Sequence, residues 1–289
     1  MAGLTKKQTY RWLLLFLLPS MLGFLVFVLT PILASLGISF TDWDLLSSIH
    51  FIGIKNYAEV LKDGEFWQSF RNTLGFILGY LPLVTIFGLL AALLVNSKIH
   101  FKSLFRGIYF LPVVTSWVAV SLVWKWLFNP SYGLLNYFLS LVGVHGPQWL
   151  EDPKTAMIAI ILTSVWKDIG FIMVIYLGGL QSIDLSFYEA AEVDGASTWQ
   201  QFWKITLPLL RKTTFFVLTI SLINSFQVFD QVNIMTGGGP GNATSVVVQS
   251  VYNHAFRYFQ MGYATAESWI LFIVILVVTI IQMKGQNSK

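Results

Sequence analysis

The sequence predicts an all-α, polytopic membrane protein, and the observations behind this are composition and segment length. Hydrophobic residues make up 55% of the 289 residues, charged residues only 11%, and the mean hydropathy is +0.67. Soluble domains carry about 25% charged residues. A membrane-spanning helix needs about 20 apolar residues. Six segments reach this length: 12–36, 74–95, 107–128, 155–180, 213–232 and 262–283.

The first predicted span follows three basic residues, Lys6, Lys7 and Arg11. A cleaved signal peptide would begin in the same way, but its apolar run is only about 7 to 15 residues long and ends at a small-residue cleavage site. This run is longer and no such site closes it. The segment 37–65 that follows carries five acidic residues against two lysines, and we expect short interfacial helices there, with Trp43 and Tyr57 at headgroup depth.

The other five predicted spans form a more compact unit. We therefore expect an N-terminal helix with an extracytoplasmic segment over residues 1–70, a transmembrane domain over 71–283 and a cytoplasmic tail over 284–289. Membrane helices tolerate the prolines inside these spans when neighbouring groups satisfy the freed carbonyls. The glycine run from Gly237 to Gly241 is expected to form a turn rather than a phosphate-binding loop, because no Gly-Lys-Ser or Gly-Lys-Thr follows it.

Lysine and arginine outside the predicted spans indicate the orientation. One side of the membrane receives eleven of them, from the N-terminus, the loops 96–106 and 181–212 and the C-terminal tail, and the other side receives five. The positive-inside rule therefore predicts that both termini and the loop 181–212 are cytoplasmic. The basic residues do not gather in one patch, so the formal charge of +4 does not predict nucleic-acid binding. The chain has no cysteine, which excludes thiol chemistry.

The loop 181–212 contains an unusual polar stretch with two helix signals. Ser186 and Glu189 have the spacing of a capping box, and Ser197 and Gln200 repeat it. Gly195 between them is a typical left-handed helix end. The first helix would have about eight residues, and isolated helices shorter than about 12 to 15 residues are marginal in water. We therefore expect this helix to pack either on the protein's own spans or in a groove of a cytoplasmic partner, and the physical argument leaves both open.

The same loop carries a family signature. Glu189-Ala190-Ala191, Gly195, Ile205 and Leu207-Pro208 resemble, in residue type and spacing, the cytoplasmic EAA motif of ABC importer membrane subunits. Further segments are similar to the first permease subunit of carbohydrate importers of the maltose and multiple-sugar type: TDWD at 41–44, FIGIKNY at 51–57, FNPSYGLLN at 128–136, GLQSI at 179–183 and FDQVNIMTGGGP at 229–240. The resemblance covers nearly the full length.

This resemblance implies a type I importer permease fold in which the loop is a coupling helix seated on an ATPase subunit. The implied partners are a second permease subunit, two cytoplasmic ATPase subunits, an extracytoplasmic sugar-binding protein and membrane lipid. The chain itself would be no enzyme and would need no cofactor, since the partner subunits bind ATP. The implied coupling residues are Tyr188, Glu189, Ala190, Ala191, Asp194, Gly195, Ile205, Leu207 and Pro208.

Charged residues inside the predicted spans are costly and usually face a cavity or a partner. Lys167 and Asp168 fall midway along the fourth span, Asp230 near the end of the fifth and Glu267 in the sixth. Lys167 could pair with an acid on an adjacent helix, which would be structural. Alternatively, the carboxylates could accept hydrogen bonds from sugar hydroxyls while aromatic rings cover the pyranose faces. The substrate-binding candidates are Trp117, Ser164, Trp166, Asp168, Phe171, Ser221, Asn224, Ser225, Phe229 and Asp230.

Two other functions are compatible with these residues. An ion-driven secondary transporter could use Lys167, Asp168 and Glu267, and it would transport without ATPase partners. An ABC permease for a phosphorylated polyol would need a cation in its cavity, and among the intramembrane residues Lys167 is placed for that role.

Overall fold

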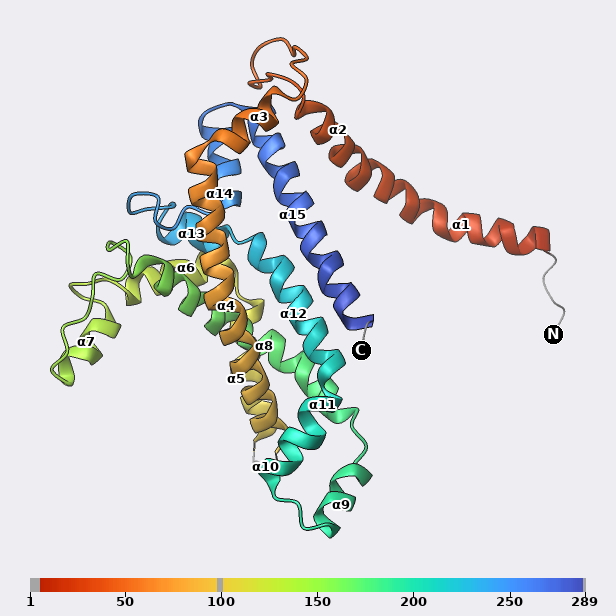
Figure 1. Cartoon of the computed structure of the whole chain (residues 1–289), viewed down its shortest axis with the longest axis vertical. Coiled ribbons are helices and arrows are strands. Elements are labelled where there is room, and N and C mark those ends of the chain that lie inside the picture. The colour runs from red at the N-terminus through yellow and green to blue at the C-terminus, as the bar shows by residue number, and fades with distance from the viewer. Residues whose placement is uncertain (1–5, 98–100, 288–289) are drawn as a thin grey trace. The chain divides into compact units, whose positions relative to one another are not determined.

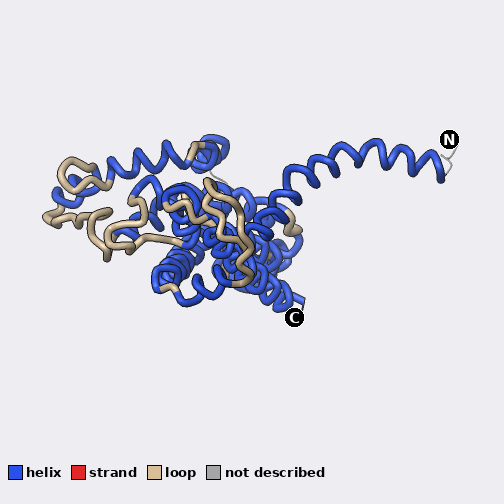
Figure 2. Tube along the Cα trace, turned by 90° about the horizontal axis from the view of Figure 1, so that it is seen from above, coloured by secondary structure: helices blue, strands red, loops and turns tan. Residues whose placement is uncertain are grey.

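The computed structural model describes residues 6–97 and 101–287, and these residues form helices joined by loops, without a strand (Figures 1 and 2). The chain divides into two compact units. One unit comprises residues 1–63 and 251–270, and the other comprises 64–250 and 271–289. The expected all-α class is confirmed.

Four helical segments are long and apolar enough to span a membrane by themselves, Trp12–Ile38, Gly64–Asn96, Ala156–Gln181 and Met261–Gly285, and they match four of the predicted spans. Two further candidates are bent pairs. Lys102–Val114 and Trp117–Leu127 meet at 100°, and Thr198–Leu209 and Arg211–Phe226 meet at 63°. With each bent pair counted as one span, the described residues contain six. The predicted span 107–128 therefore corresponds to parts of two helices with a break at residues 115–116 rather than to one helix.

The first unit contains α1 (Lys6–Phe24), the π-helical turn η1 (Leu25–Leu29), α2 (Thr30–Ile38), α3 (Lys55–Lys62), η3 (Asn253–Arg257) and the beginning of α15 (Met261–Asn287). The π-turn precedes Pro31. Because proline has no N–H to donate, the helical hydrogen-bond pattern shifts by one residue here. The Thr30 N–H and hydroxyl both donate to the Leu25 carbonyl. The segment 37–65 holds one short helix, α3, rather than several.

Two buried polar side chains organise this unit. The Asn56 amide donates to the Ser39 and Thr41 carbonyl oxygens at 2.9 and 2.8 Å, which joins α3 to the end of α2. Glu267 is fully buried, and its carboxylate lies 3.0 Å from Nδ1 of His254. The sequence singled out Glu267 as a costly intramembrane charge, but it did not indicate His254 as its neighbour.

The second unit is built around α8 (Ala156–Gln181), which packs against α4 (Gly64–Asn96), α5 (Lys102–Val114) and α12 (Arg211–Phe226) (Figure 1). Its other helical elements are α6 (Trp117–Leu127), α7 (Leu134–Leu141), α9 (Ser186–Val193), α10 (Thr198–Gln201), η2 (Phe202–Thr206), α11 (Leu207–Leu209), α13 (Asp230–Met235) and α14 (Val247–Tyr252). In α8, 56% of an apolar 18-residue stretch is buried, the largest share among the four long candidate spans. Small residues permit this close packing: a Cβ on Gly79 would lie 2.7 Å from Cδ1 of Ile161 on α8.

Gly170 on α8 marks the tightest approach of α5, and we expect Gly170→Ala to destabilise the protein. An added Cβ would overlap the carbonyl oxygen of Tyr109, which is backbone and cannot rotate away. Overpacking of this kind costs about 1–3 kcal/mol, so the thermal unfolding midpoint of the purified protein should fall. Gly178→Ala is the matched control, because it lies on the same helix with nothing within 4 Å of its new Cβ. Equal midpoints for the two variants would contradict this packing.

Candidate functional site

The segment 213–232 was expected to be one helix, and the structure corrects this. The helix α12 ends at Phe226, residues 227–229 are non-helical, and α13 begins at Asp230. Polar side chains near the end compete for backbone groups, and the Ser225 hydroxyl donates to the Ser221 carbonyl. Val228 therefore lies in the non-helical segment and does not continue the helical face of Ser221 and Ser225.

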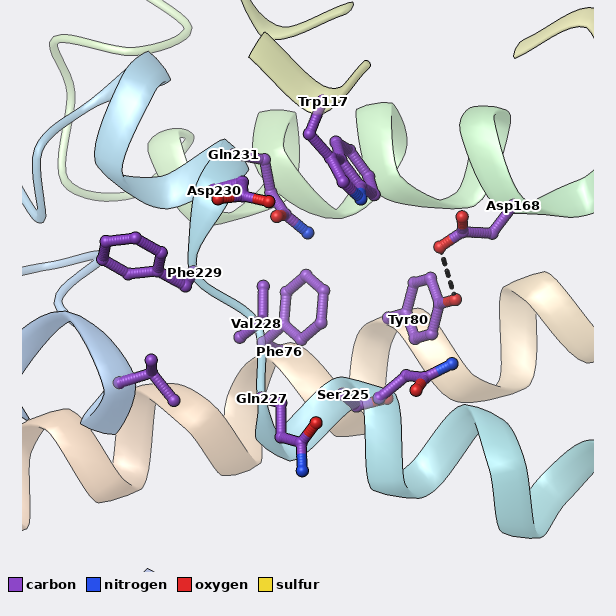
Figure 3. A pocket seen from close by; sticks show the side chains of 12 residues that line it. Phe76, Tyr80, Trp117, Asp168, Ser225, Gln227, Val228, Phe229, Asp230 and Gln231 are labelled. Carbon is purple, nitrogen blue, oxygen red and sulfur yellow. Dashed lines mark hydrogen bonds between the residues drawn. The ribbon is translucent and has the colours of Figure 1, made fainter. Parts of the chain in front are cut away.

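A cavity of about 540 Å³ opens beside this break (Figure 3). Aromatic rings, amides and two carboxylates line it together. The lining residues are Phe76, Tyr80, Trp117, Asp168, Asn224, Ser225, Gln227, Val228, Phe229, Asp230, Gln231 and Val248. They come from α4, α6, α8, α12, α13 and α14 and from the break itself. The arrangement offers flat apolar faces together with hydrogen-bonding groups, as specific small-molecule sites do.

One hydrogen bond crosses from α4 to α8 at this cavity. The Tyr80 hydroxyl donates to Oδ2 of Asp168 at 2.7 Å, and the Tyr80 ring is 4% exposed (Figure 3). Phe76 stacks on Tyr80 one turn earlier, with ring centroids 5.2 Å apart. The bond to Asp168 therefore fixes the position of an aromatic pair on the cavity wall.

Lys167 lies next to Asp168 in sequence, but it does not line the cavity. Its ammonium donates to the Val113 carbonyl at 3.1 Å and lies 4.8 Å from the centre of the Trp117 ring. Pairing of Lys167 with an acid on an adjacent helix was one of the two possibilities that the sequence left open, and no such ion pair occurs among the described residues. Its partners are instead a backbone carbonyl and an aromatic face on the bent pair α5–α6.

Six of the ten substrate-binding candidates line the cavity: Trp117, Asp168, Asn224, Ser225, Phe229 and Asp230. The other four do not. Ser164 is fully buried behind the wall and accepts a hydrogen bond of 3.1 Å from Gln231. Ser221 is buried, whereas Trp166 and Phe171 are exposed on the surface of α8.

Sequence reasoning missed Phe76, Tyr80, Gln227, Val228, Gln231 and Val248. A weak signal existed for some of these residues. Gln227 and Gln231 are amides beside an apolar run, and Phe76 and Tyr80 are aromatic residues four positions apart on one helix face. Nothing in the sequence indicates which face of 74–95 meets the fourth span.

The loop between α8 and α12 has the predicted arrangement of helix, turn and helix. Gly195 has φ +74° and ends α9, with the Ala196 N–H donating to the Ala191 carbonyl and the Gly195 N–H to the Glu192 carbonyl. This is a Schellman end. The second capping box is confirmed, because Ser197 and Gln200 each accept from the other's backbone N–H.

The start of α9 differs from the expectation. Ser186 does not cap the helix; its N–H donates to Asp184 Oδ1 at 2.9 Å instead. This bond lowers the pKa of the Asp184 carboxyl. A π-turn, η2, precedes Pro208 as η1 precedes Pro31. The Tyr188 hydroxyl lies 2.9 Å from the Thr206 hydroxyl and joins the two halves of the loop.

Most of this loop is exposed. Val193 is 88% and Trp199 68% exposed, and α9 contains no buried residue. Of the predicted coupling residues, Glu189, Ala190, Asp194, Gly195 and Pro208 are exposed, and Tyr188, Ala191, Ile205 and Leu207 are half-buried. The helix α9 therefore does not pack deeply on the protein's own described spans.

Comparison with known proteins places this arrangement in a family. Residues 84–284 match the family described as binding-protein-dependent transport system inner membrane component. The chain is 36% identical to the trehalose/maltose transport system permease protein MalF of Thermococcus litoralis, over 98% of this chain and 97% of that protein. It is also 36% identical to the lactose transport system permease protein LacF of Rhizobium radiobacter, over 95% and 94%.

Among solved structures, a chain of a bacterial alginate ABC transporter, in complex with its alginate pentasaccharide-bound periplasmic protein, superposes with a TM-score of 0.83 at 26% identity, over 96% of this chain and 94% of that chain. The matched family extends over more than half of this chain, and the two relatives match it nearly end to end. The chain is therefore a polytopic integral membrane protein that belongs to the family of binding-protein-dependent transport system inner membrane components.

Proposed function

We propose that this chain is a permease subunit of an ATP-driven carbohydrate importer and that the cavity beside the α12–α13 break is part of the sugar path. The observation that carries the proposal is the cavity wall, where Trp117, Tyr80 and Phe229 are interleaved with amides and carboxylates. Sugars present apolar ring faces and a rim of hydroxyl groups, so such a wall complements them. The trehalose/maltose, lactose and alginate systems to which the chain is similar support the same cargo class.

The charge of the wall favours an unphosphorylated cargo. The charged lining residues are Asp168 and Asp230, both acidic. Phosphate recognition relies on arginine, lysine or backbone N–H groups, and the Lys167 ammonium is turned toward Val113 and Trp117. A phosphorylated polyol is therefore the weaker alternative. Family membership likewise favours a binding-protein-dependent importer over an ion-driven secondary transporter.

The coupling mechanism is also part of the proposal. The exposed loop of α9 and α10 would sit in a groove of a cytoplasmic ATPase subunit, with Glu189 meeting a basic group there. ATP binding would close two such subunits, and the loop would transmit that motion so that the cavity opens alternately to either side. A second permease subunit would complete the path, and an extracytoplasmic binding protein would deliver the sugar. Both termini would be cytoplasmic, and this chain would carry no cofactor of its own.

Reconstitution into liposomes tests the proposal. The chain is purified with the second permease and ATPase subunits that co-purify with it, and uptake of radiolabelled trehalose, maltose and lactose is measured with the binding protein outside and ATP inside. We expect sugar uptake that depends on both ATP and the binding protein. Glycerol 3-phosphate is the comparison cargo. Uptake by this chain alone in a proton or sodium gradient, or uptake of the phosphate ester instead of any sugar, would overturn the proposal.

A further inference from the structure

A buried lysine on α8 contacts the broken span α5–α6. Lys167 is 5% exposed, and both of its contacts are to that bent pair: the Val113 carbonyl oxygen at 3.1 Å and the Trp117 ring at 4.8 Å. An ionisable residue inside a membrane span is costly, so it is retained where a partner or a function requires it. Here the partner is the break between α5 and α6.

The break lies at Thr115 and Ser116, between helices that meet at 100°. In a continuous helix the Val113 carbonyl would accept the N–H of Trp117, four residues later. The break removes that donor, and the lysine ammonium occupies its place. Side-chain hydroxyls in the break bind other backbone groups beside it. The Thr115 hydroxyl donates to the Leu111 carbonyl at 3.0 Å, and the Val118 N–H donates to the Ser116 hydroxyl at 3.2 Å.

The same break places Trp117 on the cavity wall as the first residue of α6. A cation over an indole face is attractive, and more so away from water. Consecutive helical residues point about 100° apart, so Lys167 and Asp168 contact different neighbouring residues. Lys167 contacts Trp117, and Asp168 accepts the hydrogen bond from Tyr80 (Figure 3). Two adjacent side chains of α8 thus contact two of the aromatic residues that line the cavity.

We propose that Lys167 is a positioning residue for the cargo path: by binding the Val113 carbonyl and the Trp117 ring, it holds the α5–α6 break in the geometry that places Trp117 in the cavity. The inference rests on the proposed role of the cavity. Lys167 touches no cargo itself and acts through Trp117.

The test uses the reconstituted importer with sugar uptake and binding-protein-stimulated ATP hydrolysis measured on the same vesicles. Lys167→Met keeps the length and apolar character of the side chain and removes the donor and the charge. We expect it to lower sugar uptake about tenfold, the size of one lost cation–π or hydrogen-bonded contact, while ATP hydrolysis stays within about twofold. Lys167→Arg, which can still donate and stack, should recover most of the uptake. Lys125→Met on the exposed face of α6 is the matched control and should behave as wild type.

A double-mutant cycle and a distance measurement complete the test. If the lysine acts through the indole, Lys167→Met should lower uptake by less than about twofold in a Trp117→Leu background. The chain has no cysteine, so spin labels at Val123→Cys on α6 and Val174→Cys on α8 report the position of α6 relative to the helix that carries Lys167. We expect a broader distance distribution in Lys167→Met.

Wild-type uptake and an unchanged distance distribution in Lys167→Met would overturn the inference, as would full additivity with Trp117→Leu. Absence of sugar uptake by the wild-type importer would instead refute the proposed function. In that case the distance measurement still decides whether Lys167 holds the break.

Discussion

The substitution Gly195→Val should abolish ATP-driven uptake while the transmembrane helices stay folded. Gly195 has φ +74°, a conformation that a β-branched residue adopts only at a cost of about 1–3 kcal/mol. The short helix α9 has no buried residue to offset that cost, so its Schellman end should open and the exposed surface proposed to dock on the ATPase subunit should lose its shape. Co-purification of the ATPase subunits and uptake in liposomes measure the result. Thr198→Val, an exposed position of the same loop, is the control.

Removing one carboxylate tests the same surface without changing its backbone. Glu189→Ala should weaken attachment of the ATPase subunit by about tenfold or more, the size expected when one partner of an interfacial charge pair is truncated. Glu192→Ala removes another exposed carboxylate from the same helix and should have a smaller effect. If Gly195→Val combined with Glu189→Ala retains its ATPase subunits and full transport, the docking role of this loop is wrong.

Asp168→Leu should reduce sugar uptake by at least about tenfold and leave assembly with the ATPase subunits intact. The substitution removes a cavity carboxylate and leaves the Tyr80 hydroxyl without its acceptor, which for a buried group costs about 1–3 kcal/mol. Asp168→Asn keeps an acceptor oxygen and should retain more uptake. Asn224→Leu, on the same cavity and with a cavity-exposed side chain, should also impair uptake.

Tyr80→Phe separates the contribution of the hydrogen bond from that of the carboxylate. If the bond to Tyr80 is the main role of Asp168, the two single substitutions and the double substitution should reduce uptake similarly. If the carboxylate binds sugar directly, Tyr80→Phe should have the smaller effect. Loss of the ATPase subunits from Asp168→Leu would show that this residue holds the fold rather than the cargo.

Sequence reasoning predicted most of the membrane helices because hydrophobic length is a local property. The spans ending near Ile38, Asn96 and Gln181 needed only the composition of their own segments. The helix, turn and helix of the loop between α8 and α12 could be predicted in the same way, since Gly195 and the capping pair of Ser197 and Gln200 act within a few residues of chain. The breaks at 115–116 and after Phe226 were not predicted. Hydrophobic length predicts one helix for a long apolar segment, whether or not the segment bends.

The sequence alone determined that this chain lies in a membrane, roughly where it crosses, and which loop forms a helix, a turn and a second helix, because hydrophobicity, charge placement and helix caps act over short stretches. Only the tertiary structure decided which faces form the cavity and what the intramembrane charges contact. A span that is apolar on all sides does not reveal the side that meets its neighbour. For that reason Tyr80 emerged as the partner of Asp168, and Lys167 as the partner of a broken helix rather than of an acid, only when α4, α6 and α8 were seen together.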